Sequence, residues 1–189
     1  MERPEKKERR ILLCDSISRY AVDTVINKII EINDDDDKKE ELYKNWGRDP
    51  IMLFINSRGG CVYDGLALVD MIKQSTTPVY TIGVGSVMSM ALWVWLAGEK
   101  RYIGEHAPLM FHDVSGISIG KTEELIQDLN ESKRLQKLLI DTITNCSDVT
   151  EEKVNDYITR KAEWFITPKE AKELKLADDI FRIETGLYK

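Results

Sequence analysis

A serine and a histidine are the residues of this chain best suited to covalent chemistry. Ser89 lies in GVGSVMSMALWVWLAG, Gly83–Gly98, where glycines precede a strongly apolar run. We interpret this run as a buried helix that begins near Ser86, which puts Ser89 in its first turn. A serine hydroxyl needs a base to act as a nucleophile, and the chain has only two histidines. His112 ends the apolar segment PLMFH, whereas His106, in GEHAP, is typical of a surface residue.

Two glycine-rich turns could supply the electrostatic part of such a site. NSRGG, residues 56–60, and GVGSVMS, residues 83–89, each end a predicted buried strand and open a helix. A helix N-terminus offers unpaired N–H groups and the positive end of the helix dipole, so two such ends suit an oxyanion. The spacing alone leaves the pairing of Ser89 with His112 open. A serine at a helix start often bonds its own backbone, and the chain has no GxSxG motif.

Composition limits the classes of protein to consider. A net charge of -6 argues against general nucleic-acid binding. Three widely spaced cysteines, Cys14, Cys61 and Cys146, lack metal-ligand spacing and favour reduced thiols in a cytoplasmic protein. The charged N-terminus lacks the apolar core of a signal peptide. The longest apolar run, Val87–Ala97, is about half of the ~20 residues that a membrane span needs. We therefore expect no membrane and no nucleic-acid partner.

Alternating apolar and helical segments predict an α/β fold with a largely parallel sheet. The expected strands are residues 11–13, 51–55, 79–84, 101–103 and 108–112. The expected helices are residues 21–32, 62–72, 86–96, 122–144, about 150–161, and one that begins at the capping box Thr167–Glu170. The acidic run Asn33–Glu41 is typical of a solvated loop that leads into a charged helix end.

Four segments resemble motifs of one peptidase family, in the family's order. INSRGG at 55–60 resembles INSPGG, and VMSMA at 87–91 resembles the nucleophile segment ASMG or ASMA. LMFHD at 109–113 resembles MIHQP, and AEWFITPKEAKELKLAD at 162–178 resembles DRFLSAPEAVEYGLVD. Over about residues 11–183 the chain resembles the proteolytic subunit of the Clp protease, ClpP, a family of serine peptidases.

The resemblance implies a role for each matching residue. Ser89 matches the nucleophile and His112 the general base. Glu163 matches the third member of the triad, where the family usually has aspartate. The backbone N–H groups of Gly60 and Met90 match the oxyanion hole.

Asp113 is the nearest alternative to Glu163 in sequence. In a strand, however, successive side chains point to opposite faces, so the side chain of Asp113 is expected to point away from that of His112.

The resemblance also implies a fold and an assembly. The fold is the ClpP/crotonase-type spiral of ββα units, with a projecting handle helix at about 122–144. Residues 11–183 form a single peptidase domain between a charged arm, 1–10, and a tail, 184–189. A long helix with a leucine stripe needs a partner chain to cover it. The implied partners are further copies in a ring, by family default two heptamers, and an AAA+ unfoldase; neither metal nor cofactor is implied.

Departures from the family pattern suggest a divergent member, of which a phage-encoded protein is one candidate. Arg58 replaces the proline of INSPGG, and Ala91 replaces the commoner glycine. The N-terminus is short for the family's axial loops, and the connection 33–50 is long.

The expected activity is that of a serine endopeptidase, which cleaves unfolded polypeptides or short peptides in an oligomeric chamber through an acyl-enzyme on Ser89. Two alternatives stay open. One is a catalytically silent ring subunit or scaffold. The other is a crotonase-fold enzyme that acts on acyl-CoA, which would use the paired amides but no serine–histidine pair.

Overall fold

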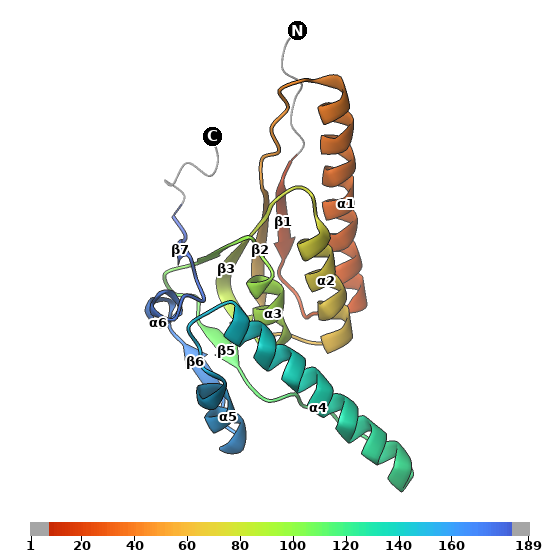
Figure 1. Cartoon of the computed structure of the whole chain (residues 1–189), viewed down its shortest axis with the longest axis vertical. Helices are drawn as coiled ribbons and strands as arrows, with labels where there is room; N and C mark the ends of the chain where they lie inside the picture. Colours follow the sequence, from red (N-terminus) through yellow and green to blue (C-terminus); the bar gives the residue numbers. More distant parts are fainter. Residues whose placement is uncertain (1–7, 183–189) are drawn as a thin grey trace.

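A mostly parallel sheet of seven strands is the frame of the computed structural model, which describes residues 8–182 (Figure 1). The strands are β1 (Arg10–Leu13), β2 (Ile51–Ser57), β3 (Val79–Met88), β4 (Lys100–Ile103), β5 (Leu109–Phe111), β6 (Trp164–Ile166) and β7 (Asp179–Ile180). β1, β2, β3, β4 and β7 lie in that order and pair in parallel. β5 pairs in parallel with the end of β3, and β6 pairs antiparallel with β5. The expected α/β fold is confirmed.

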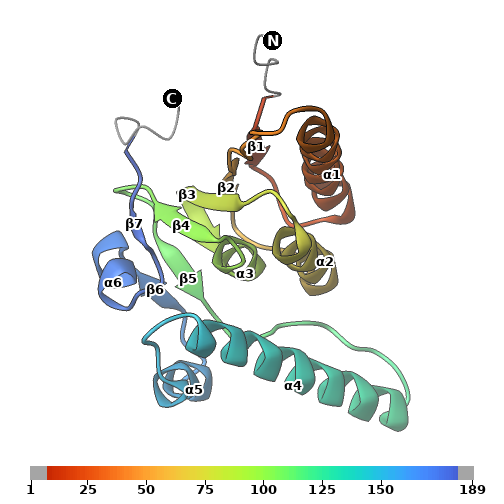
Figure 2. The same cartoon turned by 45° about the horizontal axis from the view of Figure 1, so that its top comes forward.

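Six helices connect the strands within the described part of the chain. They are α1 (Arg19–Leu42), α2 (Val62–Gln74), α3 (Met90–Leu96), α4 (Thr122–Asn145), α5 (Glu151–Thr159) and α6 (Pro168–Glu173). Figure 2 shows α1, α2 and α3 side by side along one face of the sheet. The predicted capping box at the start of α6 is present, since Thr167 and Glu170 bond each other's backbone N–H groups.

The apolar run that follows Gly85 is divided between a strand and a helix, whereas the prediction assigned all of it to a helix. Residues 86–88 continue β3, and α3 begins only at Met90, so the predicted helix start near Ser86 is wrong. The reason is pairing with other segments. Val87 pairs with β5, and the backbone N–H of Ser86 donates to the side-chain oxygen of Asn56 at 2.9 Å. These partners hold the segment extended despite its helical pattern.

The acidic run was also predicted wrongly, because it forms the C-terminal half of α1 rather than a solvated loop. Asp36 in this run is completely buried. Its carboxylate accepts two hydrogen bonds from the guanidinium of Arg9, at 2.5 and 2.8 Å. It also accepts hydrogen bonds from the hydroxyl of Thr77 at 2.7 Å and the indole N–H of Trp46 at 3.0 Å. These donors are distant in sequence, and they satisfy a carboxylate that the local sequence predicts to be solvated.

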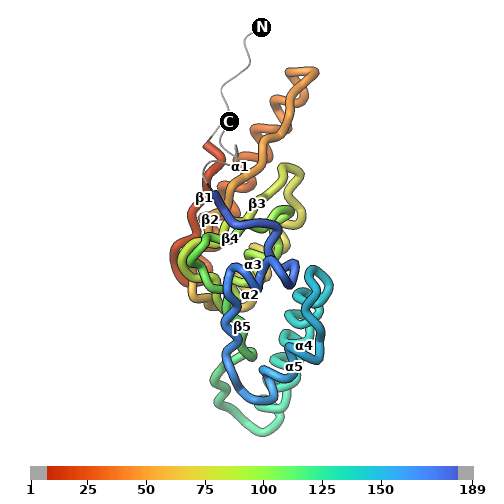
Figure 3. The backbone as a smooth tube through the Cα atoms, turned by 90° about the vertical axis from the view of Figure 1, so that its left-hand side faces the viewer, coloured from red at the N-terminus to blue at the C-terminus, as the bar shows by residue number. Residues whose placement is uncertain are grey.

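The helix α4 extends away from the sheet, and its two halves differ in burial (Figure 2). Leu139 and Ile143, in the C-terminal half, are buried, and the indole N–H of Trp93 donates to the carbonyl oxygen of Leu139 at 3.0 Å. Leu125 and Leu129, in the N-terminal half, are partly or largely exposed. The projecting half therefore carries an apolar surface that this chain leaves uncovered. Figure 3 shows that this helix and the C-terminal end of α1 lie at opposite ends of the molecule.

We predict that Asp36→Ala destabilises the protein by about 3–5 kcal/mol, because it leaves the buried guanidinium of Arg9 without its partner. Asp34→Ala, at an exposed position of the same helix, should change stability by no more than about 0.5 kcal/mol. Urea denaturation of both variants at one protein concentration measures the difference. Equal midpoints for the two variants would contradict the assigned role of Asp36.

The contribution of Asp36 to the stability of the fold should depend on pH. Burial alone would raise the pKa of Asp36, but the hydrogen bonds from Arg9, Thr77 and Trp46 outweigh it and lower this pKa. A carboxyl group with a lowered pKa stabilises the folded state above its unfolded value, near 4, and loses that contribution as the pH falls through the folded value. The stability gap between the parent chain and Asp36→Ala should therefore narrow in acid.

Candidate active site

Ser89 and His112 are in direct contact. The hydroxyl oxygen of Ser89 lies 2.8 Å from Nε2 of His112. Ser89 follows β3 and His112 follows β5, and these strands pair in parallel up to Met88 and Met110. The backbone N–H of Ser89 also donates to the carbonyl oxygen of Met110 at 2.9 Å. The structure thus brings together the two residues that the sequence singled out, whereas His106 is exposed, as expected.

The backbone of Ser89 adopts an unusual conformation for a residue other than glycine, with φ 51° and ψ -134°. Such a conformation costs of the order of 1–3 kcal/mol and persists only where the surroundings hold it. Ser89 occupies the residue before α3, yet its side chain makes no capping hydrogen bond to the helix. The sharp turn from strand to helix therefore leaves the hydroxyl free to contact His112.

The glycines of NSRGG let a second backbone segment approach this turn. Gly59 has φ +101°, and a Cβ there would lie 2.6 Å from Cβ of Ser89 and 2.8 Å from the carbonyl oxygen of Met88. Real Cβ atoms do not approach other atoms so closely, so this position needs glycine for space as well as for conformation. The turn therefore packs directly against the residue that bears the hydroxyl.

Gly60 is fixed from the other side by the segment that precedes α1. It has φ +154°, and a Cβ there would lie 2.3 Å from the carbonyl oxygen of Ile17. The N–H of Ile17 donates to the carbonyl oxygen of Gly59 at 2.9 Å, and the N–H of Cys61 donates to that of Ile17 at 2.8 Å. These two bonds fix the glycine turn to the segment that precedes α1.

Two backbone donors near the hydroxyl have no partner within residues 8–182. The N–H groups of Gly60 and Met90 donate no hydrogen bond to any residue in that range. Both residues line one cavity together with Ser89 and His112. Unpaired amides beside a nucleophile can hold the negative oxygen that develops when a carbonyl is attacked.

The cavity that these residues share is small, and its lining is both polar and apolar. Its volume is about 50 Å³. The apolar side chains that line it belong to Val62, Met90, Trp93, Val114 and Leu139. Asp113 also lines it, next to His112. Both residues follow the end of β5 at Phe111.

Glu163 forms no hydrogen bond with His112. In the antiparallel pair of β5 and β6, Phe111 is opposite Trp164, and His112 and Glu163 are the residues next beyond this last pair. The side chain of Glu163 is nevertheless exposed, and it forms no hydrogen bond or ion pair with any residue of 8–182. Its role stays a prediction.

A model of the Clp protease family matches residues 5–184 of the sequence. The chain belongs to the Clp protease family. It is 30% identical over 176 residues to the ATP-dependent Clp protease proteolytic subunit of Borreliella afzelii, covering 92% of this chain and 83% of that one. It is 32% identical over 133 residues to the corresponding subunit of Pleurastrum terricola, covering 69% of this chain and less than two thirds, 63%, of that one.

The fold of this Clp protease chain is similar to that of a solved ClpP structure. The structure of a ClpP1 mutant from Listeria monocytogenes superimposes with a TM-score of 0.79. The match covers 95% of this chain and 94% of the other, at 24% sequence identity. At this identity the likeness establishes the fold, which is the expected ClpP type with α4 as its projecting helix.

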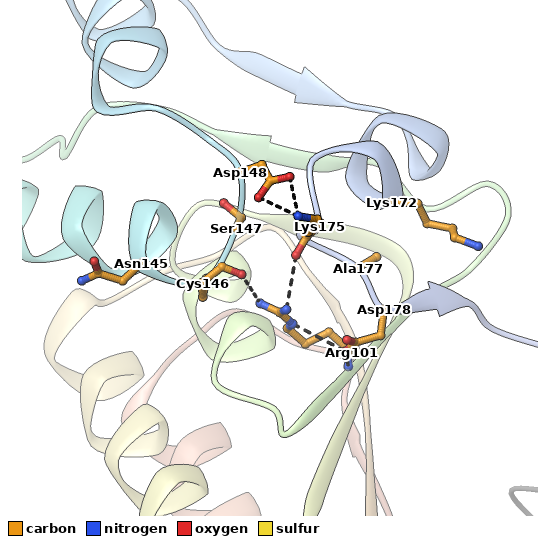
Figure 4. A pocket seen from close by; sticks show the side chains of 9 residues that line it. All are labelled: Arg101, Asn145, Cys146, Ser147, Asp148, Lys172, Lys175, Ala177 and Asp178. Atoms are coloured by element: carbon orange, nitrogen blue, oxygen red, sulfur yellow. Dashed lines mark hydrogen bonds and ion pairs between the residues drawn. The ribbon is translucent and has the colours of Figure 1, made fainter.

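A second and larger cavity of the Clp protease chain, about 490 Å³, is a junction of paired charges (Figure 4). Arg101 of β4 donates to the carbonyl oxygens of Cys146 and Lys175 at 3.0 and 3.3 Å, and lies 3.7 Å from the carboxylate of Asp178. The ammonium of Lys175 lies 2.9 Å from the carboxylate of Asp148. These hydrogen bonds and ion pairs connect the end of α4 to the segment between α6 and β7.

Residues 8–182 contain neither a metal-binding cluster nor a membrane-spanning helix. No group of three His, Cys, Asp or Glu side chains in that range is arranged to hold a metal ion. None of the helices there is long and apolar enough to cross a membrane.

We predict that Gly59→Ala lowers the thermal unfolding midpoint by several degrees, because the added Cβ collides with Ser89 and requires φ +101°. A loss of 1 kcal/mol shifts the midpoint by about 2–4 °C in a chain of this length. Gly47→Ala is the matched control, since a Cβ there meets nothing within 4 Å. Scanning calorimetry compares the two, and similar midpoints would contradict the close approach of the glycine turn to Ser89.

Proposed function

We propose that this Clp protease chain is a serine endopeptidase that cleaves unfolded polypeptides or short peptides. The observation that carries the proposal is the 2.8 Å contact between the hydroxyl of Ser89 and Nε2 of His112, beside the unpaired amides of Gly60 and Met90. The names of the relatives, proteolytic subunits of an ATP-dependent protease, agree with this activity.

The first half of the proposed reaction transfers the acyl group to the enzyme. The oxygen of Ser89 attacks the carbonyl carbon of a peptide bond while Nε2 of His112 accepts the hydroxyl proton. The carbonyl oxygen becomes negative and accepts hydrogen bonds from the N–H groups of Gly60 and Met90. The C–N bond then breaks, His112 gives its proton to the leaving amine, and an ester remains on Ser89.

The second half regenerates the enzyme. A water molecule takes the place of the amine and attacks the ester carbon while His112 accepts one of its protons. The bond between that carbon and the oxygen of Ser89 breaks, and His112 returns the proton to the serine. The other product is a carboxylic acid. Every step uses residues of this chain and water, so the proposed cycle requires neither a metal nor an organic cofactor.

Glu163 is proposed as the residue that orients His112. With Nε2 facing Ser89, the other ring nitrogen of His112 is left to donate its hydrogen to a carboxylate. In support, His112 and Glu163 both adjoin the last pair of the ladder, Phe111 with Trp164, and the exposed side chain of Glu163 is free to change rotamer. An ionised carboxylate at that nitrogen would stabilise the imidazolium that forms in each half-reaction.

Assembly with further copies is proposed to enclose the site. The projecting half of α4 exposes Leu125, Ile126 and Leu129, and the segment before it exposes Ile117 and Ile119 almost fully. A surface of this kind is typical of an interface between protein chains. The family default of two heptameric rings would use it and create a chamber. A separate AAA+ unfoldase would then supply unfolded chains at the expense of ATP, in the cytoplasm.

One alternative has an observation in its favour. A catalytically silent ring subunit or scaffold is favoured by the absence of a contact between Glu163 and His112 in residues 8–182. A crotonase-fold enzyme that acts on acyl-CoA would need the paired amides but would leave the contact between Ser89 and His112 without a role.

We predict that a fluorophosphonate labels the native protein once per chain at Ser89, because His112 activates this hydroxyl. Intact mass spectrometry measures the adduct. Ser89→Ala and His112→Ala should abolish it, and Ser86→Ala, which alters a nearby serine of β3, should retain it. A parent chain that stays unlabelled while it is folded and assembled would support the silent subunit instead.

We predict that Glu163→Gln lowers kcat for a short fluorogenic peptide by roughly 10²- to 10⁴-fold, as expected for loss of the group that orients a catalytic histidine. Glu163→Asp should retain more activity, because it keeps a carboxylate. Glu152→Gln, at an exposed carboxylate on α5, is the matched control and should be close to the parent. Unchanged kcat in Glu163→Gln would show that another group orients His112.

A further inference from the structure

Trp93 forms a fixed wall of the cavity that also contains Ser89. The side chain of Trp93 is buried, and its indole N–H donates to the carbonyl oxygen of Leu139 at 3.0 Å. Its ring also packs against that of Phe111, with the two centroids 5.6 Å apart. In a close-packed core a side chain held in this way cannot turn aside without losing its hydrogen bond. The wall that Trp93 forms is therefore rigid.

Other apolar residues complete the lining on the neighbouring helices. Val62 is the first residue of α2, Leu139 belongs to α4, and Val114 follows β5. The helix α3, which carries Trp93, packs against both α2 and α4. The apolar part of the cavity is therefore enclosed by helices whose positions the core determines.

The cavity has room for only a few atoms of a substrate. Its volume of about 50 Å³ corresponds to roughly four water molecules at ~10–15 Å³ each. The attacked carbonyl group must share this space, because Ser89 and the residues of the two unpaired amides, Gly60 and Met90, line the same cavity. The carbon and oxygen of that carbonyl occupy about half of the volume, which leaves room for roughly two non-hydrogen atoms of a side chain.

The side chain that enters this space belongs to the residue that supplies the carbonyl. Its Cβ is attached to the atom next to the carbonyl carbon, whereas the amide nitrogen also separates the Cβ of the following residue from that carbon. The remaining space is therefore filled from the N-terminal side of the cleaved bond.

We propose that this cavity accepts only a small side chain, such as the methyl group of alanine, on the N-terminal side of the cleaved bond, and that Trp93 sets this limit. The inference rests on the proposed function, because it assigns the substrate class of the same site. A leucine side chain would overfill the cavity and would have to displace Trp93 from Leu139. A larger apolar pocket would have the opposite preference, since each buried methylene favours binding.

Two fluorogenic peptides test the proposal. They share one sequence and one fluorogenic amine, and they differ only before the cleaved bond, where one has alanine and the other has leucine. The assembled protein should hydrolyse the alanine peptide with a kcat/KM roughly tenfold higher or more, as expected for a pocket that excludes the extra carbon atoms. Trp93→Phe removes one ring of the indole and should lower this ratio by roughly tenfold, because it admits leucine.

A second variant and a control separate the size of the cavity from damage to the fold. Val62→Ala enlarges the same cavity and disturbs the fold less, because Val62 is only partly buried and alanine is a good helix former. It should lower the ratio in the same direction, and it decides the test if Trp93→Phe does not fold. Val69→Ala makes the same change at a partly buried position of α2 outside the cavity lining, and it should keep the parent ratio.

Several outcomes would overturn the proposal. An equal or higher kcat/KM for the leucine peptide in the parent protein would exclude a small pocket. A preference for alanine that persists in folded, assembled Trp93→Phe and Val62→Ala would show that other groups set the limit. Labelling of Ser89 by a fluorophosphonate without cleavage of the alanine peptide would refute this inference alone. If neither peptide is cleaved and Ser89 is not labelled, the proposed function itself fails, and this inference fails with it.

Discussion

The parallel pairing of β5 with the end of β3 is the constraint on which the site depends. Met88 pairs with Met110, so the residues that follow the two strands emerge at one edge of the sheet. Ser89 and His112 are 23 residues apart in sequence and 2.8 Å apart in space for this reason. Both strands lie in the core, where a shift in register would displace a whole row of buried side chains. The contact is therefore fixed by the frame of the molecule rather than by side chains on its surface.

The same edge explains why a hydroxyl stands at the start of the most apolar helix. All seven residues of α3 are buried, so the helix is anchored tightly in the core. β3 holds the other side of Ser89, and Gly59 fills the space against its Cβ. A backbone with φ 51° needs surroundings of this rigidity. The hydrophobic residues of GVGSVMSMALWVWLAG thus hold the hydroxyl of Ser89 in its position against His112.

Sequence reasoning was most effective where a residue type was scarce and least effective where partners come from distant segments. With two histidines in the chain, position at a strand end favoured His112, and the family resemblance then selected it. The start of α3 was misplaced because Val87 finds its partner in β5. Asp36 was assigned to solvent because its donors Arg9 and Thr77 lie 27 and 41 residues away.

The two carboxylates near His112 have different surroundings, and the histidine can orient on only one of them. Nε2 faces Ser89, so a single ring nitrogen remains to donate to a carboxylate. Glu163 is exposed, so it gives up part of its solvation when it forms that bond. One oxygen of Asp113 is already inaccessible to solvent and accepts no hydrogen bond. If Glu163 occupies the nitrogen, Asp113 keeps this unsatisfied oxygen, so the orientation of His112 decides which of the two carboxylates gains a donor.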